Sequence, residues 1–261
     1  MLEHRASEAV NIAKSGGALA VDYFRRIGSL VIEDKGHQDF VSEADKAVEL
    51  HVRAMIESAF PDDGIVGEEH APKPSISGFT WVIDPIDGTT NFINSIPAWV
   101  VVLAVVQNDQ TVIGVTHDPL HDELFSAVSG QGARLNGETL ICPPDAVLTR
   151  GTISTGYSTR ISSGGVVSLI DSITSEGGVF HRNASGALSL AYVAAGRLIG
   201  YVEEHMNAWD CLAGQLLIAE AGGKVETQSA DEMIENGGRV VAGSVGVFDD
   251  LVRIADKACQ A

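Results

Sequence analysis

The sequence predicts an α+β protein in which helices pack on β-sheets in layers. Segments with the 3.6-residue period of amphipathic helices alternate with short runs that have the composition of β-strands. A strand expected over residues 100–106 is apolar on both faces, so both sides of its sheet should be covered. The chain has 261 residues, of which 45% are hydrophobic, which is enough to bury a large core. Such a pattern favours helical layers on either side of a sheet.

The N-terminal half, about residues 1–145, should begin with two helices. Apolar residues recur at helical spacing over 3–27 and again over 43–59. Ser42 is the expected N-cap of the second helix, and the Pro61–Gly64 turn should end it. Short strands and a meander should then follow. The expected strands span residues 65–67, 80–83, 99–107, 111–117, 124–128 and 133–135.

The C-terminal half, about residues 146–261, should alternate strands and helices after a break at Cys142–Asp145. A glycine pair, Gly222-Gly223, should end the third helix of this half. We expect the two halves to form a single domain. The expected strands span residues 152–155, 179–181, 198–203, 224–227 and 239–242. The expected helices span residues 163–175, 186–196, 209–221 and 247–258.

Charge and composition limit the classes of ligand. The net charge of −18 argues against a nucleic acid as the main ligand, because binding a phosphate backbone requires clusters of Lys and Arg. No apolar run approaches the roughly 20 residues that span a bilayer, and the N-terminus lacks the pattern of a signal peptide. Cys142, Cys211 and Cys259 form no disulfide or zinc pattern. We therefore expect a cytoplasmic protein that does not bind membranes.

The most informative segment is Asp-Pro-Ile-Asp-Gly-Thr-Thr-Asn-Phe, residues 84–92. Asp84 and Asp87 lie three residues apart where an apolar strand ends, and carboxylates that are close together repel each other unless a cation lies between them. Residues 78–97 contain no Lys or Arg, so a metal ion is the natural cation. Mg²⁺ prefers oxygen ligands, and the N-terminus of the short helix expected next attracts anions. The segment predicts metal-assisted phosphate chemistry.

Three more carboxylates are candidates to join this pair. Glu68 follows a short strand, Asp210 opens a helix after a strand, and Asp45 lies near the start of the second helix. Active sites of α/β proteins collect at strand ends and at the helix N-termini that follow them. Each residue also has a structural alternative: Asp45 could complete a capping box with Ser42, Glu68 could lie in a solvated loop, and Asp210 could be an ordinary first-turn acid.

Together these motifs resemble the inositol monophosphatase family. The resemblance rests on residues 84–92, on Gly67-Glu-Glu before them, and on Trp209-Asp-Cys-Leu-Ala-Gly and Glu220-Ala-Gly-Gly downstream, and it extends over essentially the whole chain. The family consists of Mg²⁺-dependent, lithium-sensitive phosphatases of small phosphate monoesters, usually homodimers, with an αβαβα sandwich fold. The resemblance therefore implies this layered sandwich, this cofactor and a small-molecule phosphate as substrate.

The resemblance also implies roles for individual carboxylates. Glu68, Asp84 and the backbone carbonyl of Ile86 would bind one Mg²⁺. Asp84, Asp87 and Asp210 would bind a second, and Glu68 would share a third, weaker ion with water molecules. Two or three Mg²⁺ ions per site follow from this assignment. Asp87 and Asp210 would also lie beside the substrate.

The remaining roles concern the water and the substrate. By the same resemblance, Thr89 and Asp45 would polarise the attacking water, with Glu68 nearby, and the N–H groups of Gly88 and Thr89 would hold the phosphate. The segment Ala184-Ser185-Gly186, together with Glu203, would face the alcohol part of the substrate. No Ser or Cys nucleophile is required in this scheme.

The substrate region departs from the family pattern. The family commonly has Gly-Ser/Thr-Ala where this chain has Ala184-Ser185-Gly186, so the glycine has moved to the other side of the serine. Glu204 is a one-residue alternative to Glu203 as the substrate-facing acid. These departures lie in the region that should select the alcohol. The resemblance to the family makes inositol 1-phosphate or a related polyol phosphate the first expectation. Histidinol phosphate and a nucleotide 3′-phosphate such as adenosine 3′,5′-bisphosphate remain alternatives.

Other classes of function were weighed against this one. The haloacid dehalogenase signature spaces its acids two apart, whereas Asp84 and Asp87 are three apart, which disfavours that class. A regulatory, protein-binding role would be an addition to catalysis, because every matched catalytic position is present in this chain.

Overall fold

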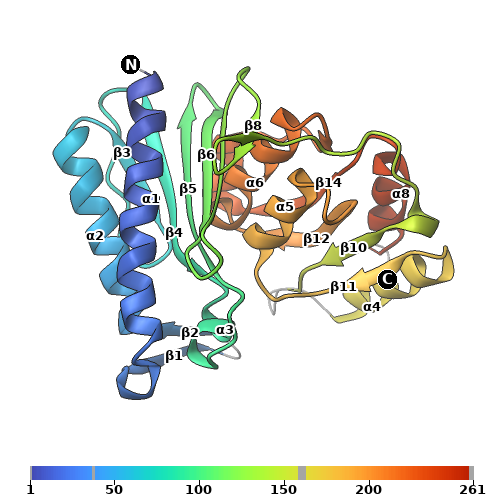
Figure 1. Ribbon diagram of the computed structural model, residues 1–261, viewed down its shortest axis with the longest axis horizontal. Coiled ribbons are helices and arrows are strands. Elements are labelled where there is room, and N and C mark those ends of the chain that lie inside the picture. The colour runs from blue at the N-terminus through green and yellow to red at the C-terminus, as the bar shows by residue number, and fades with distance from the viewer. Residues whose placement is uncertain (1, 37–38, 158–162, 259–261) are drawn as a thin grey trace.

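The computed structural model describes residues 2–36, 39–157 and 163–258, which form two large β-sheets, a two-stranded sheet and three layers of helices. Helices α1 and α2 cover one face of a seven-stranded sheet, and α5 and α6 lie between this sheet and a five-stranded sheet. Helices α4 and α8 form the last layer, on the far face of the second sheet (Figure 1). The order αβαβα confirms the predicted sandwich.

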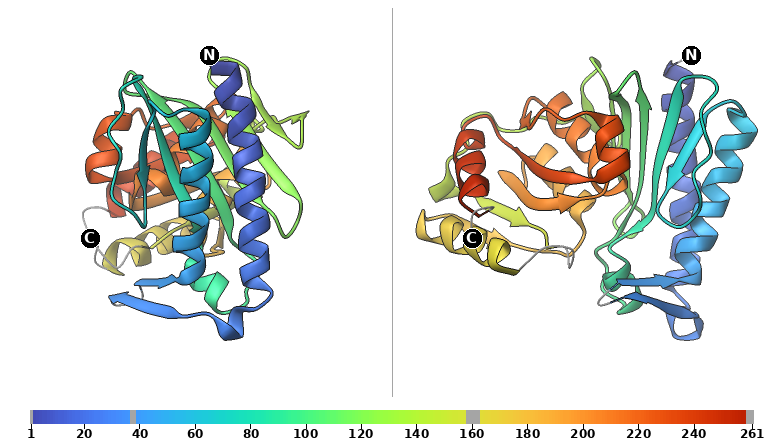
Figure 2. Two further views of the ribbon diagram at one scale, coloured as in Figure 1. Left: turned by 90° about the vertical axis from the view of Figure 1, so that its left-hand side faces the viewer. Right: turned by 180° about the vertical axis from the view of Figure 1, so that it is seen from behind.

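The first layer consists of α1 (Leu2–Phe24) and α2 (Glu43–Ala59), which lie side by side (Figure 2). The bounds of α2 agree with the prediction, because Ser42 accepts a hydrogen bond from the Ala44 N–H and caps the helix. Helix α1 ends before the predicted residue 27, because Ile27–Ser29 form a separate 3₁₀ turn, η1.

The seven-stranded sheet has the order β3-β4-β5-β6-β7-β8-β9. Strand β3 pairs parallel to β4, and all other neighbours in this sheet pair antiparallel. The strands are β3 (Gly64–Gly67), β4 (Phe79–Asp87), β5 (Val100–Gln107), β6 (Gln110–Asp118), β7 (Glu123–Val128), β8 (Ala133–Leu135) and β9 (Glu138–Thr139). Between β4 and β5 the chain forms the short helix α3 (Thr89–Ile93).

Strand β5 is buried on both faces, as its sequence predicted. Leu103 and Val105 belong to the core under α1 and α2. Val102 and Ala104, on the alternate positions, belong to the core formed with α5 and α6. The strand therefore separates two cores. Its antiparallel neighbour β4, which precedes it in the chain, carries Asp84 and Asp87.

The five-stranded sheet has the order β11-β10-β12-β14-β13, in which β10 pairs parallel to β11 and β12. Its strands are β10 (Thr152–Thr155), β11 (Val179–His181), β12 (Gly200–Met206), β13 (Lys224–Val225) and β14 (Gly238–Gly243). Its helices are α4 (Ser163–Ser175), α5 (Gly186–Ala194), α6 (Ala208–Glu220), α7 (Ala230–Asn236) and α8 (Phe248–Ala258), and η2 (Leu148–Arg150) precedes β10.

The sequence analysis missed three kinds of element. The antiparallel hairpin of β1 (Ile32–Gly36) and β2 (Asp39–Ser42) leads into α2 and packs against α3. Strand β9 has two residues and carries no usable pattern. Helix α7 does have a signal, because Ser229 accepts a hydrogen bond from the Glu232 N–H in the Ser-x-x-Glu arrangement typical of helix starts.

Further predictions concern cysteines and membranes. Cys142 and Cys211 are buried free thiols, and Cys259 lies outside the described residues. Among the helices that the structure describes, none has the length and apolarity to cross a bilayer.

Candidate active site

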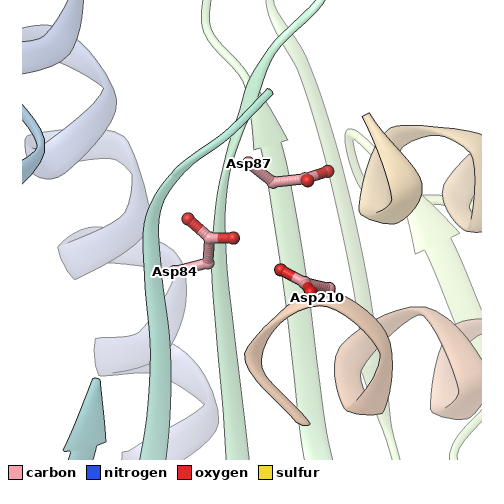
Figure 3. Close-up of side chains that lie close together, drawn as sticks. All are labelled: Asp84, Asp87 and Asp210. Carbon is pink, nitrogen blue, oxygen red and sulfur yellow. The ribbon is translucent and has the colours of Figure 1, made fainter. Parts of the chain in front are cut away.

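Three carboxylates, Asp84, Asp87 and Asp210, converge between β4 and α6, with an oxygen of each within 4.8 Å of the others (Figure 3). Residues three apart on a regular strand point to opposite faces of the sheet. Here the register shifts, so that Asp84 pairs with Val102 but Asp87 with Val100, and the extra residue forms a bulge. The bulge therefore explains how both acids of one strand reach the same site.

Asp210 reaches this site because α6 packs very closely on the seven-stranded sheet. A Cβ atom at Gly114 of β6 would lie 2.7 Å from the Ala213 carbonyl oxygen, so only a glycine permits this approach. Asp210 is also the N3 residue of α6, and its carboxylate accepts a hydrogen bond from the Asn207 N–H at 3.2 Å. The expected first-turn acid and the expected member of the cluster are thus the same side chain.

The cluster is electrostatically strained in the absence of a cation. Asp84 is only 1% exposed, and burial, followed by repulsion from Glu68, Asp210 and Asp87, raises its pKa well above the usual value. Burial and repulsion from Asp210 likewise raise the pKa of Asp87 to about 7. Carboxylate oxygens are hard donors, and three carboxylates that repel one another fit a hard divalent cation such as Mg²⁺.

Asp87 also connects the cluster to α5. Its Oδ2 accepts a hydrogen bond from the Ser185 hydroxyl at 2.5 Å and another from the Ala187 N–H at 2.8 Å. Ser185 is the N-cap of α5, and the favourable position for an acid is near a helix N-terminus. The end of β4 and the start of α5 are therefore held together through one carboxylate.

Asp45 both caps α2 and contacts Thr89. Its Oδ2 accepts hydrogen bonds from the Ser42 N–H at 2.9 Å and from the Ser42 hydroxyl at 2.6 Å. Its Oδ1 lies 3.2 Å from the Thr89 hydroxyl, which is also 3.2 Å from the Ile86 carbonyl oxygen. The capping box is therefore present, and the same fully buried carboxylate faces the loop that follows β4.

Gly88 connects β4 to α3 in a conformation that glycine adopts most easily. Its φ is +102°, and an added Cβ would lie 2.9 Å from the Ala98 carbonyl oxygen. The turn brings Thr89, the first residue of α3, next to Asp45. Glu68 follows β3 and lies outside the group of three carboxylates, although its charge contributes to the raised pKa of Asp84.

A polar cavity of about 160 Å³ adjoins the carboxylates. Asp87 and Asp210 line it on the side of the cluster, and Thr155, Arg182 and Glu203 are among the residues that line it from the five-stranded sheet and its loops. The cavity thus joins the carboxylate cluster to side chains that can hydrogen-bond to a polar molecule.

Glu203 lies in this cavity and is held by a neighbour on the same strand face. The hydroxyl of Tyr201, two residues earlier on β12, donates a hydrogen bond to Glu203 Oε2. Burial raises the pKa of Glu203 to about 8. Glu204 points elsewhere, because its Oε1 fills the space where a Cβ at Gly165 of α4 would lie. Of the two acids that the sequence left open, Glu203 is the one that lines the cavity.

The displaced glycine of the segment 184–186 has a structural explanation. Ala184 adopts φ +60°, a left-handed conformation that a glycine would adopt without strain. A Cβ at Gly186 would lie 2.6 Å from Met206 Cε and 3.2 Å from the Tyr201 hydroxyl. An alanine at this position would require Met206 and Tyr201 of β12 to shift, whereas Gly186 needs no such adjustment.

Sequence reasoning missed Tyr201, Arg182 and Glu49. Tyr201 had a signal, because residues two apart on a strand share a face. Arg182 precedes α5 without a motif of its own. Glu49 forms an i,i+4 pair with Arg53, a pattern typical of an exposed helix face, although Glu49 is fully buried behind the loop that contains Glu68.

The layered αβαβα architecture and the cluster of three carboxylates match the class of protein that the sequence resembles. The model of the inositol monophosphatase family matches residues 1–259. The Nus factor SuhB of Escherichia coli K12 is 36% identical over 247 residues, which cover 94% of this chain and 92% of that protein. This chain therefore belongs to the inositol monophosphatase family.

Solved structures agree with this assignment. The extragenic suppressor protein suhB of Bartonella henselae superposes with a TM-score of 0.90 at 31% identity, covering 96% of this chain and 98% of that one. The inositol monophosphatase of Anabaena superposes with a TM-score of 0.83 at 31% identity, covering 97% of this chain and 95% of that one. The family membership supports a phosphatase.

Proposed function

We propose that this protein hydrolyses a small phosphate monoester with Mg²⁺ as cofactor. The observation that carries the proposal is the cluster of buried Asp84 with half-buried Asp87 and Asp210, which opens onto a polar cavity of about 160 Å³. Two or three Mg²⁺ ions would be held by these carboxylates, by Glu68 and by the Ile86 carbonyl oxygen. When bound there, Mg²⁺ supplies positive charge against the phosphate oxygens and makes water a stronger acid.

The protein's own groups would orient the reactants and take up a proton. Thr89 Oγ1 donates a hydrogen bond to Asp45 Oδ1 at 3.2 Å. Thr89 Oγ1 would take a proton from the attacking water while its own hydroxyl proton passes to the Asp45 carboxylate. The N–H groups of Gly88 and Thr89 would hold the phosphate. Positioning and charge neutralisation are the main requirements of phosphoryl transfer, so no covalent intermediate is needed.

The cavity favours a substrate whose alcohol part is rich in hydrogen-bonding groups. Glu203, Arg182 and the Thr155 hydroxyl line it, together with Ala184-Ser185-Gly186. Thr155 Oγ1 and Asn183 Nδ2 are buried polar atoms without a partner in the described part of the chain, so they are available for hydroxyl groups of a ligand. We therefore propose inositol 1-phosphate or a related polyol phosphate as the substrate.

The test measures phosphate release with and without Mg²⁺ on D- and L-inositol 1-phosphate, histidinol phosphate, adenosine 3′,5′-bisphosphate and glycerol 2-phosphate. We expect a Mg²⁺-dependent preference of about 100-fold for an inositol phosphate, or about 2.7 kcal/mol of discrimination. A preference for histidinol phosphate or for the nucleotide would select that alternative instead. Asp87→Asn and Asp210→Asn should each abolish most turnover, and near-full activity in either variant would contradict the metal assignment.

Properties usual in the family extend the proposal. We expect inhibition by lithium, a homodimer and a cytoplasmic location. Adding LiCl to the Mg²⁺-dependent assay tests the first, and the molar mass from light scattering tests the second. Fractionation of the producing cell tests the third.

A regulatory, protein-binding role is the second candidate function. It is favoured by the relative from Escherichia coli, which is named Nus factor SuhB, although catalysis and partner binding can coexist on one fold. A pull-down with the Asp87→Asn protein separates the two. Specific partners retained by this inactive variant would support the added role, and their absence would leave the phosphatase as the sole proposal.

A further inference from the structure

A fully buried carboxylate, Glu49, lies behind the loop that follows β3. It belongs to α2, one helical turn after Asp45, and none of its surface is exposed. Glu49 Oε2 accepts a hydrogen bond from the Glu69 N–H at 2.7 Å, and Glu49 Oε1 lies 3.3 Å from His70 Nδ1. The carboxylate thus contacts the two residues that directly follow Glu68.

The residue before Glu68 is fixed by the same carboxylate. A Cβ atom at Gly67 would lie 2.2 Å from Glu49 Oε1 and 2.5 Å from its carboxyl carbon. Gly67 is therefore packed directly against Glu49, and no larger residue fits there unless the carboxylate moves. Because Gly67 and Glu69 both contact Glu49, the backbone of Glu68 is held from both sides by one side chain.

Arg53 neutralises Glu49 and extends the contact. Its Nε donates a hydrogen bond to Glu49 Oε1 at 2.7 Å, and its Nη2 donates to the His70 carbonyl oxygen at 3.1 Å. A buried carboxylate is costly unless it is paired and hydrogen-bonded, and both conditions are met here. The pair therefore holds residues 67–70 against α2.

Helix α2 consequently contacts two loops, one after β4 and one after β3. Asp45 contacts Thr89 beyond the end of β4, whereas Glu49 contacts the loop beyond the end of β3. Strands β3 and β4 are parallel neighbours, so both contacts lie at the same edge of the sheet. Four residues apart on one helix, the two acids hold the two loops at a fixed separation.

From this geometry we infer that Glu49 is a positioning residue for the divalent cation site. It fixes the backbone on both sides of Glu68, the residue to which the proposed function gives a share in binding the metal. The inference rests on the proposed metal-dependent function. Residues that orient the ligands of a metal contribute to its affinity, and their loss weakens binding about ten- to hundredfold.

The test compares Glu49→Gln with a matched control, Glu226→Gln. Glu226 is likewise paired with an arginine, Arg239, through the guanidinium Nε, and Arg239 also contacts Asp256 of α8 in the last helical layer. Both substitutions remove the charge of a carboxylate that accepts a hydrogen bond from an arginine. Only Glu49 lies behind the loop that contains Glu68.

The readout is the binding of Mn²⁺, a hard cation, without any substrate, by electron paramagnetic resonance of the free ion. For Glu49→Gln we expect a dissociation constant about ten- to hundredfold above that of the native protein, with saturating Mg²⁺ restoring most of the turnover. For Glu226→Gln we expect a dissociation constant within about twofold of the native value. Equal Mn²⁺ affinity in the folded Glu49→Gln and native proteins would overturn the inference about Glu49 and leave the proposed function standing.

A second variant covers the case in which Glu49→Gln does not fold. The double variant Glu49→Leu, Arg53→Met removes both charges together, a replacement that buried ion pairs often tolerate. It should fold, judged by circular dichroism, and should show the same loss of Mn²⁺ affinity because the Glu69 N–H loses its acceptor. Native-like Mn²⁺ binding by the double variant would also overturn the inference. Failure of the native protein to bind Mn²⁺ would overturn the proposed function as well.

Discussion

Replacing Asp84 by asparagine should stabilise the metal-free protein while abolishing its response to Mg²⁺. At an effective dielectric constant of about 20, two carboxylates 4.8 Å apart repel each other by about 3 kcal/mol. Asp84 experiences repulsion from Asp87, Asp210 and Glu68, and asparagine removes that charge without changing the shape of the side chain. The amide oxygen can still accept the hydrogen bond that the Ile86 N–H donates to Asp84 at 2.9 Å.

The expected gain is smaller than the full Coulomb energy. Because its pKa is raised, Asp84 avoids part of the repulsion by remaining protonated. We therefore expect the free energy of unfolding in EDTA at pH 8 to rise by about 2 kcal/mol, which corresponds to an increase in Tm of about 4–8 °C. In 10 mM Mg²⁺ the order should reverse, since a ligand at 100 times its Kd stabilises the native protein by about 2.7 kcal/mol.

Thermal and urea denaturation in EDTA and in Mg²⁺ measure both effects. Asp63→Asn is the control, because Asp63 accepts hydrogen bonds from Arg5 at 2.8 and 2.6 Å and from Trp81 Nε1 at 2.9 Å. The same substitution should be destabilising at this ion-paired site. If Asp84→Asn lowered the stability in EDTA while the control behaved as expected, repulsion within the cluster could not be its dominant electrostatic feature.

Three more predictions follow from single side chains. Ala184→Gly should raise the free energy of unfolding by about 0.5–1 kcal/mol in urea denaturation, because glycine has no Cβ atom and adopts a φ of +60° without strain. Tyr201→Phe should lower kcat/KM about tenfold, mainly through KM, because Glu203 loses its hydroxyl donor; an effect on kcat alone would argue against this role. The Mg²⁺-induced increase in Tm should grow from pH 5.5 to pH 8. In the metal-free folded protein Asp87 keeps its proton up to a pKa of about 7, whereas in the unfolded chain it loses the proton near pH 4. The stability of the metal-free protein therefore falls as the pH rises toward 7. Mg²⁺ must displace the same proton to bind, so Mg²⁺ binding becomes more favourable over the same range. A pH-independent Mg²⁺ effect would contradict the last prediction.

The elements that the sequence predicted well are those with local signals. Helix α2 carries an N-cap, a capping acid and a continuous apolar stripe, and its bounds agree with the prediction. Strand β5 is apolar from Val100 to Val106, and its burial on both faces follows from that composition. The β1–β2 hairpin has no comparable signal, because its stability depends on contacts with α3 that are distant in the sequence.

The same distinction applies to the site. The carboxylates could be selected from their motifs, but the bulge that turns Asp84 and Asp87 toward one another depends on the pairing of β4 with β5. The glycine at position 186 of α5 lies against Met206 and Tyr201, which approach it from β12. Packing between elements that are far apart in the sequence decides both features, and no local pattern records them.

Capping and metal binding are compatible roles for the acids of this site. Asp45 accepts hydrogen bonds from Ser42, and Asp210 accepts one from the Asn207 N–H, so each of these acids at a helix start is anchored by a capping contact. Asp87 is similarly anchored by the Ala187 N–H at the start of α5. A backbone donor that binds a carboxylate fixes its rotamer and leaves other lone pairs available to a cation. Asp87 and Asp210 can therefore be kept in place beside Asp84 before the cation arrives, because each of the two is held by a helix start that it also stabilises.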